Sequence, residues 1–277
     1  MKKKIIVIGS KGMAGHIIYF KLKSSSDFDV IDISRNDEFF SSNYKLNINN
    51  TTALKNIFKS EKPNVVINCI GVLNKNAEDN PDKAIFLNSY FPHFLAKEGM
   101  LRNFKLIHIS TDCVFNGEKG DYKEIDTKDG FGFYAQSKAL GEVNYDNHLT
   151  IRTSIIGPEL KDNGIGLFHW FMHQKGKIHG YTKTFWGGVT TLELAKAIES
   201  FIRQDIKGLV HLTNGIKISK FELLNIIKDI FKTEDKEIIP TEGKISDKSL
   251  CTTRKDLNYI VPSYKDMVRE IFLQMQT

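Results

Sequence analysis

The stretch "KKIIVIGSKGMAG", residues 3–15, decides the fold. Its first part is a short apolar run that ends in glycine, which is typical of a buried strand in a parallel sheet. Gly9, Gly12 and Gly15 follow between this strand and the start of a helix. Glycines there permit a tight turn, a close approach of the backbone to phosphate, and close packing of helix on sheet. We therefore predict a dinucleotide-binding turn, although the G-x-x-G-x-x-G spacing differs from the G-x-G-x-x-G fingerprint and also fits a plain turn.

Strands and helices alternate along the rest of the first half. Strands are expected at residues 28–34, 103–112 and 148–156, helices at residues 13–25, 81–100 and 134–146, and a helix followed by a strand within residues 51–71. This alternation implies right-handed crossovers between parallel strands. The predicted fold class is α/β, a doubly wound parallel sheet of the Rossmann type.

The regular alternation of strands and helices ends at about residue 155. Helices are expected at residues 164–174, 190–204, 219–233 and 263–275, and a strand at residues 208–213. Ser219 and Glu222 form a capping-box pattern at the start of one of these helices. We predict a dinucleotide-binding domain that carries the catalytic residues at 1–157, and mainly a smaller α/β substrate lobe at 158–277. The lobe should cover the carboxyl ends of the strands, where ligands bind in such folds.

Composition excludes several classes of function. The net charge of +6 is spread along the chain without a dense Lys/Arg block among aromatic residues, so nucleic acid is not an expected partner. A modest positive balance fits an anionic substrate, and it fits ordinary surface solubility better. No apolar stretch reaches the ~18 residues of a membrane span, and the apolar run at the start is too short for a cleaved leader. Three cysteines without metal-like spacing indicate reduced thiols in a cytoplasmic protein, with no metal site.

The end of the second predicted strand bears on the choice of cofactor. Ser34 and Arg35 lie about 20 residues after Gly15, where an arginine accommodates the 2′-phosphate of NADP and an acid binds the ribose of NAD. Arg35 therefore favours NADPH, although a solvated surface cation is its other interpretation. Asp32 leaves NADH open if the strand ends two residues earlier.

Two further motifs carry polar side chains suited to proton transfer. Ser110, Thr111 and Asp112 follow a buried strand at the predicted carboxyl edge of the sheet, where they also fit an ordinary turn. Tyr134 precedes Lys138 by four residues on a predicted helix, so the two side chains share a face. Together they predict a hydride-transfer site. The phenol supplies a proton, the ammonium lowers the pKa of the phenol, and the Thr111 hydroxyl orients the substrate carbonyl.

At this point four stretches, "GSKGMAG", "ISTDCVFNG", "FYAQSKALGE" and "IRTSIIG", resemble those of an extended short-chain dehydrogenase/reductase. Within that group the chain is most similar to dTDP-4-dehydrorhamnose reductase and its relatives, which reduce the 4-keto group of nucleotide-linked 6-deoxy sugars. The resemblance covers the whole chain. It is strong over residues 1–157 and weaker beyond, where "GYTKTFWGGVTTLELAKAI" resembles the sugar-nucleotide lobe.

The resemblance implies a catalytic set of Thr111, Tyr134 and Lys138, with Asn88 as a supporting residue. It also implies a group of cofactor-binding residues at strand ends and first turns: Gly9, Lys11, Gly12, Met13, Gly15, Ser34, Arg35, Cys69, Gly71, Ser110, Tyr134 and Lys138. The family usually carries tyrosine where Cys113 stands, and proline and glycine near the tyrosine where Phe133 and Ala135 stand. These departures leave the substrate more open than the reaction.

Substrate contacts are expected from a smaller set: Asp112, Cys113, Trp186 and Arg254. His169, Trp170 and His173 offer contacts to a nucleotide base, but aromatic residues at helical spacing also fit a core or a subunit surface. Arg254 and Lys183 are candidates for a diphosphate. Cys113 also fits a small buried apolar position.

The expected function is NADPH-dependent reduction of a 4-keto-6-deoxy nucleotide sugar in deoxysugar or surface polysaccharide biosynthesis. The "RTSIIGPEL" and "GYTKTFWGG" segments are similar to those of reductases that act on N-acetylated sugars. The expected partner is a nucleotide diphospho-sugar, and a homodimer is left open. Two alternatives stay open: an epimerase or dehydratase on the same scaffold, and a non-catalytic regulatory subunit that keeps the dinucleotide fold.

Overall fold

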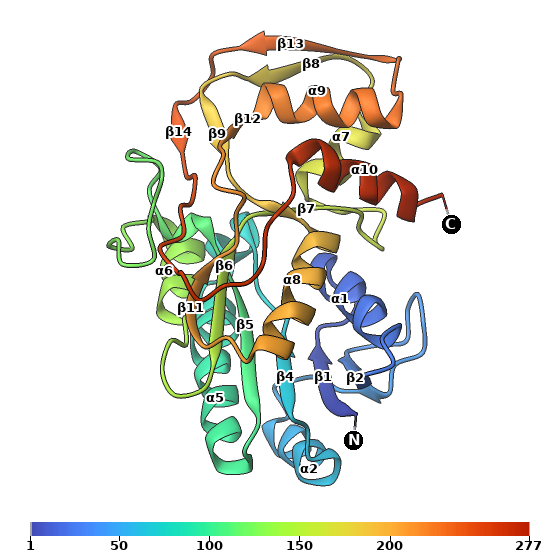
Figure 1. Cartoon of the computed structure of the whole chain (residues 1–277), viewed down its shortest axis with the longest axis vertical. Helices are drawn as coiled ribbons and strands as arrows, with labels where there is room; N and C mark the ends of the chain where they lie inside the picture. The colour runs from blue at the N-terminus through green and yellow to red at the C-terminus, as the bar shows by residue number, and fades with distance from the viewer. Residues whose placement is uncertain (1, 277) are drawn as a thin grey trace.

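The computed structural model describes residues 2–276, so the terminal residues of the predicted ranges, 1 and 277, lie outside it. A seven-stranded sheet forms the larger part of the molecule (Figure 1). All its strands run parallel, in the order β11 (Gly208–His211), β6 (Leu149–Thr153), β5 (Lys105–Thr111), β4 (Val65–Asn68), β1 (Lys3–Ile8), β2 (Phe28–Ser34), β3 (Tyr44–Lys45). The predicted doubly wound sheet of the Rossmann type is confirmed.

Helices cover both faces of this sheet because its central strands are apolar on both sides. Residues 5–8 of β1 are completely buried. One face packs against α1 (Met13–Lys23) and α8 (Thr191–Gln204), and the other packs against α2 (Thr51–Glu61) and α5 (Phe91–Arg102). Because all strands run parallel, their carboxyl ends lie together at one edge of the sheet.

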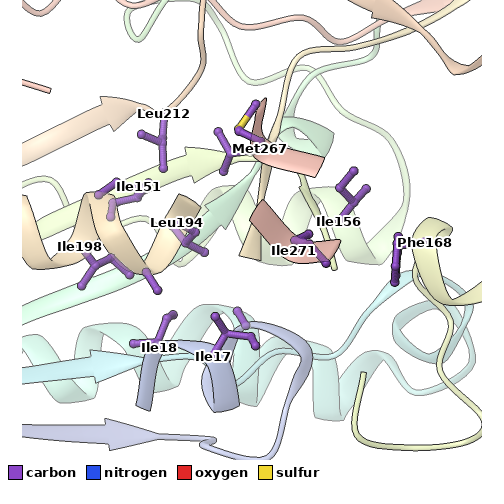
Figure 2. Close-up of a cluster of buried hydrophobic side chains, with 14 of the residues drawn as sticks. Ile17, Ile18, Ile151, Ile156, Phe168, Leu194, Ile198, Leu212, Met267 and Ile271 are labelled. Atoms are coloured by element: carbon purple, nitrogen blue, oxygen red, sulfur yellow. The ribbon is translucent and has the colours of Figure 1, made fainter. Parts of the chain in front are cut away.

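The core under α1 and α8 continues into the rest of the chain (Figure 2). Ile17 and Ile18 of α1 share this core with Leu194 and Ile198 of α8, and Figure 2 shows them in one cluster. The same cluster includes Phe168 of α7 (Leu167–His173) and two residues of α10 (Tyr264–Gln274), Met267 and Ile271. Each fully buried aliphatic side chain stabilises the fold by roughly 1.5–3 kcal/mol. One continuous core therefore fixes the lobe on the sheet.

The lobe contains short strands that the sequence pattern did not predict. β8 (Gly176–Tyr181) pairs in parallel with β13 (Lys236–Thr241), and β9 (Thr184–Trp186) lies between β12 (Ile218–Ser219) and β14 (Ser246–Asp247). The strand predicted at residues 148–156 consists of β6 and a separate short strand, β7 (Ile155–Ile156), which pairs with β10 (Val189–Thr190). The helix α9 (Lys220–Phe231) begins at Ser219, and both halves of the predicted Ser219/Glu222 capping box are formed.

The sequence order and the spatial parts do not coincide completely. α8 and β11 lie after residue 157 in the sequence, yet α8 packs on α1 and β11 extends the large sheet. The chain therefore leaves the lobe and returns to it. The division of the chain at residue 157 stays a prediction.

Two helices near the site differ from the expected ranges. The helix predicted at residues 81–100 consists of α4 (Pro81–Ala84), a π-helical turn η1 (Ile85–Tyr90), and α5. The helix predicted at residues 134–146 is α6 (Gly132–Leu140). Gly141 is the residue after this helix, and it packs so tightly on η1 that a Cβ on it would lie 1.7 Å from the carbonyl oxygen of Asn88. Two short helices, α3 (Asn74–Asp79) and the 3₁₀ turn η2 (Asp112–Val114), complete this region.

Candidate active site

Two adjoining cavities lie over the carboxyl ends of the strands. The larger one, of about 1000 Å³, extends from the start of α1 past the ends of β5 and α6 into the lobe, and we call it the reaction cavity. The second, of about 830 Å³, is lined by the glycine turn, the end of β2 and the segment that follows β2, and we call it the β2 cavity. Gly12, Met13, Cys69 and Gly71 line both. The two cavities therefore adjoin at these residues.

The glycine turn has the geometry that a phosphate site requires. Gly9 has a φ of +85°, and a Cβ on it would lie 2.8 Å from the Ile70 side chain. A Cβ on Gly15 would lie 2.0 Å from the Gly9 carbonyl oxygen, so α1 packs directly on the turn. α1 begins after Gly12 without a side-chain cap and with no acidic residue in its first turn. Its first N–H groups and the positive end of its dipole are therefore available to an anion.

The β2 cavity contains the residues predicted to meet the adenosine end of the cofactor. Lys11, Ser34 and Arg35 all line it. The Lys11 ammonium donates to the carbonyl of Phe40 at 2.6 Å and to that of Asn36. Arg35 is exposed, and its guanidinium makes no hydrogen bond or ion pair within residues 2–276.

Asp32, the residue that left NADH open, is engaged elsewhere. β2 continues through Ser34, so Asp32 lies inside the strand and is completely buried. Its carboxylate accepts from the Ser10 hydroxyl at 2.6 Å and from the Asn43 N–H at 2.7 Å. Asp32 is therefore not free to bind a ribose.

The structure brings Thr111, Tyr134 and Lys138 to one wall of the reaction cavity. Thr111 ends β5, and its hydroxyl donates to the Asp112 carboxylate at 3.1 Å while it accepts from the Cys113 N–H at 3.1 Å. Tyr134 and Lys138 come from successive turns of α6. The predicted catalytic side chains thus share one surface of the cavity.

Neighbouring elements hold α6 in place. Glu78 of α3 accepts from the N–H groups of Phe133 and Tyr134, at 3.0 and 3.1 Å, and so caps the first turn of α6. Asn88 in the π-helical turn donates to the Ser137 hydroxyl at 3.0 Å and exchanges hydrogen bonds with the backbone of Val72. A π-helical turn at this place suits a functional site. Asn88 therefore supports the wall from behind, without lining either cavity.

The protonation of the wall differs from the sequence-based expectation. Burial raises the pKa of Tyr134, and the hydrogen bond with Thr111 opposes this only in part. Burial lowers the pKa of Lys138 to about 8. The expected lowering of the Tyr134 pKa by Lys138 is wrong for this structure. The Lys138 amine donates to the Ile109 carbonyl at 2.7 Å and lies 3.3 Å from His108 Nε2, so it is directed at β5.

Ser110, predicted as a cofactor contact, lines the reaction cavity with its hydroxyl already engaged. That hydroxyl donates at 2.8 Å to Glu142, a buried carboxylate. Glu142 also accepts from two nitrogens of the buried Arg152, at 2.6 and 2.7 Å, and lies 3.2 Å from the Lys128 amine. This buried ion pair therefore holds the Ser110 hydroxyl in place.

Cys69 and Cys113 line the reaction cavity as neutral thiols. Burial raises the pKa of Cys69 to about 12 and that of Cys113 to about 11. A thiol, unlike a thiolate, is a poor nucleophile. Both residues therefore shape the cavity.

The lobe side of the reaction cavity contains residues that the sequence analysis missed. Lys220, the first residue of α9, lines the cavity, and burial lowers its pKa while Asp112 and Cys113 raise it. Lys177 and Tyr181 of β8 alternate with the buried residues Ile178 and Gly180, so they share the other face of the strand and line the cavity. The alternating pattern "GKIHGY" was the signal that could have revealed them.

Some predicted lobe residues reach the cavity and others do not. Trp186, which is buried, and Trp170, which is partly exposed, line it. The structure does not bring Arg254 to either cavity. Its guanidinium donates to the carbonyls of Lys207 and Leu209 and pairs with Asp256.

The remaining lobe candidates also lie outside the site. Lys183 pairs with Glu242 at 3.0 Å. His169 and His173 contact each other on α7, with ring centroids 4.3 Å apart, and line neither cavity. Within residues 2–276, no group of three or more His, Cys, Asp and Glu side chains is placed to hold a metal ion. No helix in that range is long and apolar enough to cross a membrane.

Residues 2–249 match the family described as the RmlD substrate binding domain. The chain belongs to this family. The predicted likeness to dTDP-4-dehydrorhamnose reductases is confirmed at this level. Among relatives of known name, methionine adenosyltransferase 2 subunit beta of Danio rerio is 24% identical over 254 residues, which cover 86% of this chain and 77% of that protein.

Solved structures of other proteins show the same fold. A hypothetical dTDP-4-dehydrorhamnose reductase from Sulfolobus tokodaii superposes with a TM-score of 0.76 at 27% identity, covering 90% of this chain and 92% of that one. The dTDP-4-dehydrorhamnose reductase of Bacillus anthracis in complex with NADP superposes with a TM-score of 0.82 at 20% identity, covering 99% and 100%.

Proposed function

We propose that this protein is an NADPH-dependent reductase of the 4-keto group of a nucleotide-linked 6-deoxy sugar, in deoxysugar or surface polysaccharide biosynthesis. One observation carries the proposal. Thr111, Tyr134 and Lys138 lie on one wall of a cavity that continues from the start of α1 at Gly12 to Lys220 of the lobe. The names of the superposed structures, which are dTDP-4-dehydrorhamnose reductases, support the same reaction.

The residues of the β2 cavity fit a dinucleotide phosphate. The uncapped start of α1 suits the pyrophosphate, and Arg35, which lines the same cavity as Lys11, suits a 2′-phosphate. Asp32 is occupied by Ser10 and Asn43, which favours NADPH over NADH. When bound, the cofactor supplies a hydride to the substrate carbonyl carbon.

Tyr134 supplies the proton of the proposed reaction. Burial keeps its phenol protonated, so the proton is available at the hydroxyl until negative charge develops on the substrate oxygen. Thr111, on the same wall, can orient the carbonyl by donating to the same oxygen once its hydroxyl turns from the Asp112 carboxylate. After hydride reaches C4, the Tyr134 proton completes the product hydroxyl, and the phenolate regains a proton from solvent.

The lobe end of the reaction cavity fits the anionic diphosphate part of the substrate. Lys177 and Lys220 line this end, and Asp112 is the one carboxylate among the cavity's lining residues within residues 2–276. This excess of cations suits a diphosphate. Trp170 and Tyr181 offer aromatic faces for a base.

The non-catalytic alternative is favoured by one observation, the similarity to methionine adenosyltransferase 2 subunit beta. A regulatory subunit needs the fold and a partner surface without turnover. The epimerase or dehydratase alternative shares the scaffold, but a dehydratase usually needs an acid pair, and the cavity lining contains Asp112 alone. A homodimer stays a prediction for every candidate, and sedimentation analysis tests it.

The experiment that tests the proposal is NADPH consumption by purified protein. The substrates are 4-keto-6-deoxy nucleotide sugars, with and without an N-acetyl group. Consumption that Tyr134→Phe loses supports the reductase, and the preferred sugar identifies the substrate. Tight NADPH binding without consumption of any sugar would favour the regulatory subunit. Interconversion of sugar epimers without net consumption would favour the epimerase.

A further inference from the structure

The helix that carries Tyr134 takes its N-terminal cap from another part of the chain. Phe131, the residue before α6, has a side chain without hydrogen-bonding atoms, and the first turn of α6 contains no acidic residue. Glu78 of α3, more than fifty positions earlier, accepts from the Phe133 N–H at 3.0 Å with one carboxylate oxygen and from the Tyr134 N–H at 3.1 Å with the other. A carboxylate on a different helix therefore satisfies the open N–H groups at the start of α6.

The start of α6 has the backbone that this carboxylate requires. Gly132 has a φ of +86°, in the left-handed region that favours glycine. A Cβ on Gly132 would lie 2.6 Å from Glu78 Oε1, so any other residue there would displace the carboxylate. Glu78 is exposed, and its carboxylate makes no other hydrogen bond or ion pair within residues 2–276. Both the glycine and the carboxylate are therefore committed to this contact.

The Tyr134 side chain also rests on α3. It packs against a small core of Val72, Ala77 and Ala84, which is separate from the two large cores on the faces of the sheet. Ala77 precedes Glu78 on α3. Adjacent residues of one short helix therefore hold the side chain and the backbone of the proposed proton donor, so a shift of α3 would move Tyr134.

α3 borders both cavities. Leu73, the residue before α3, lines the reaction cavity and the β2 cavity, and Asn76 on α3 lines the β2 cavity. A cofactor that fills the β2 cavity therefore contacts the helix that holds Tyr134. We propose that Glu78 is a positioning residue for Tyr134, and that α3 couples an occupied cofactor cavity to the start of α6. The catalytic consequence of this coupling rests on the proposed function.

The coupling requires no change of fold. A ligand contact at Leu73 or Asn76 restrains α3, and Glu78 passes the restraint to the first turn of α6. Tyr134 is then held in place when the cofactor is bound. The position of a proton donor matters to the rate, because a displacement of about 1 Å can lower a rate about 10²-fold.

The first test uses NADPH binding and needs no sugar. Amide hydrogen exchange of Phe133 and Tyr134 is followed by NMR in the ¹⁵N-labelled protein, with and without saturating NADPH. NADPH should slow exchange at both amides by about tenfold or more in the wild-type protein, because opening of the first turn must then move a restrained α3. In Glu78→Ala, NADPH should change the two exchange rates by less than about twofold. Equal slowing in the two proteins, or no slowing in a wild-type protein that binds NADPH, would overturn the coupling.

Two control variants separate this role from general effects of lost charge or a lost cap. Asp79→Ala removes the neighbouring acid of α3, and Asp79 lines neither cavity. Ser263→Ala removes the exposed cap of α10, where the Ser263 hydroxyl accepts from the Asp266 N–H at 3.2 Å. Both variants should keep the wild-type kcat and the wild-type response of the two amides to NADPH. A control that matched Glu78→Ala in either measurement would overturn the proposal.

The second test measures sugar reduction by the same variants. Glu78→Ala should lower kcat by about tenfold to 10²-fold and change the KM of the sugar less than about twofold. Glu78 is exposed, so water can replace it at the N–H groups and the variant should fold. Glu78→Gln keeps one acceptor oxygen for these N–H groups and should recover most of the lost kcat. A glutamine variant as slow as Glu78→Ala, or an effect on KM alone, would overturn the positioning role. Absence of turnover in the wild-type protein would bear on the proposed function alone.

Discussion

The two sides of the reaction cavity differ in how their polar groups are satisfied. On the wall, Thr111 and Lys138 are engaged in hydrogen bonds within the protein, and Asn88 supports them from behind. On the lobe side, the side-chain amines of Lys177 and Lys220 make no hydrogen bond or ion pair with any of residues 2–276. The difference teaches that the groups proposed for chemistry are ordered before a ligand arrives. Those proposed for substrate recognition are left for the ligand to pair.

This comparison predicts a separation of kinetic effects. A substitution on the wall should lower kcat, because it removes an interaction realised only in the transition state. A substitution on the lobe side should raise the KM of the sugar with little change in kcat. A wall variant that raises only the KM, or a lobe variant that lowers only kcat, would contradict this expectation.

The largest effect is expected from Tyr134→Phe. Loss of the proton donor should lower kcat by about 10²- to 10⁴-fold, the usual contribution of general acid catalysis. NADPH affinity, measured by fluorescence titration, should change little. Tyr90→Phe is the matched control, because Tyr90 is an exposed tyrosine that lines neither cavity. A Tyr134→Phe enzyme with wild-type kcat would show that Tyr134 is not the proton donor.

The next effect is on stability, from the ion pair behind the wall. Glu142→Gln leaves the buried Arg152 guanidinium without its charge partner, which should lower the free energy of unfolding by about 3 to 5 kcal/mol. Urea denaturation measures this, with the exposed Glu237→Gln as control. An unchanged midpoint would show that the pair does not hold the wall.

The same ion pair predicts a pH dependence. Burial alone would raise the pKa of Glu142, but Arg152 and Lys128 lower it below its ordinary value of about 4.3. A depressed carboxyl pKa stabilises the fold above that ordinary value. The stabilisation should therefore be lost as the pH falls through the folded pKa, and this acid-dependent loss should shrink in Glu142→Gln.

A smaller effect sharpens the cofactor assignment. Arg35→Ser should raise the KM for NADPH about tenfold or more, because a hydrogen bond to a charged group contributes about 1.5–3 kcal/mol. The KM for NADH should stay nearly constant, since NADH lacks the 2′-phosphate. Arg269→Ser, on α10 and away from both cavities, controls for the loss of a surface charge. Equal changes for both cofactors would contradict the 2′-phosphate role.

The smallest effect is expected on the lobe side. Lys220→Met should raise the KM of the nucleotide sugar about fivefold, equivalent to about 1 kcal/mol, without changing NADPH affinity. Lys177→Met should have a weaker effect in the same direction, because Lys177 is more exposed. Lys228→Met lies on the same helix as Lys220 but lines neither cavity, so it should leave both constants unchanged. A loss of kcat in Lys220→Met would show that Lys220 takes part in the chemical step, as proposed for the wall residues.

The sequence was sufficient where the signal is local. Apolar runs, the spacing of Gly9 to Gly15, and the four-residue step from Tyr134 to Lys138 each lie within one element or turn, so they predicted the sheet and the wall. Contacts between distant segments were not readable. Tertiary packing places Lys220 near enough to Asp112 for the carboxylate to raise its pKa. The Arg254 guanidinium donates to the carbonyls of Lys207 and Leu209, and the sequence does not show that these carbonyls are available to it.

The protonation of the wall was missed for the same reason. Helical spacing places Lys138 one turn after Tyr134, but it does not show that His108 and the Ile109 carbonyl face the amine from β5. The π-helical turn at Asn88 was equally hidden, because it packs against Gly141, a residue more than fifty positions away in the sequence.

The central claim is hydride transfer to C4 of a nucleotide sugar with the Tyr134 proton. The most direct measurement uses NADPH that carries deuterium in both positions at C4 of the nicotinamide, with the preferred sugar from the panel and mass and NMR analysis of the product. The account predicts one deuterium at C4 of the sugar in the wild-type protein and almost none in Tyr134→Phe. Product without deuterium, or equal labelling by the two proteins, would contradict it.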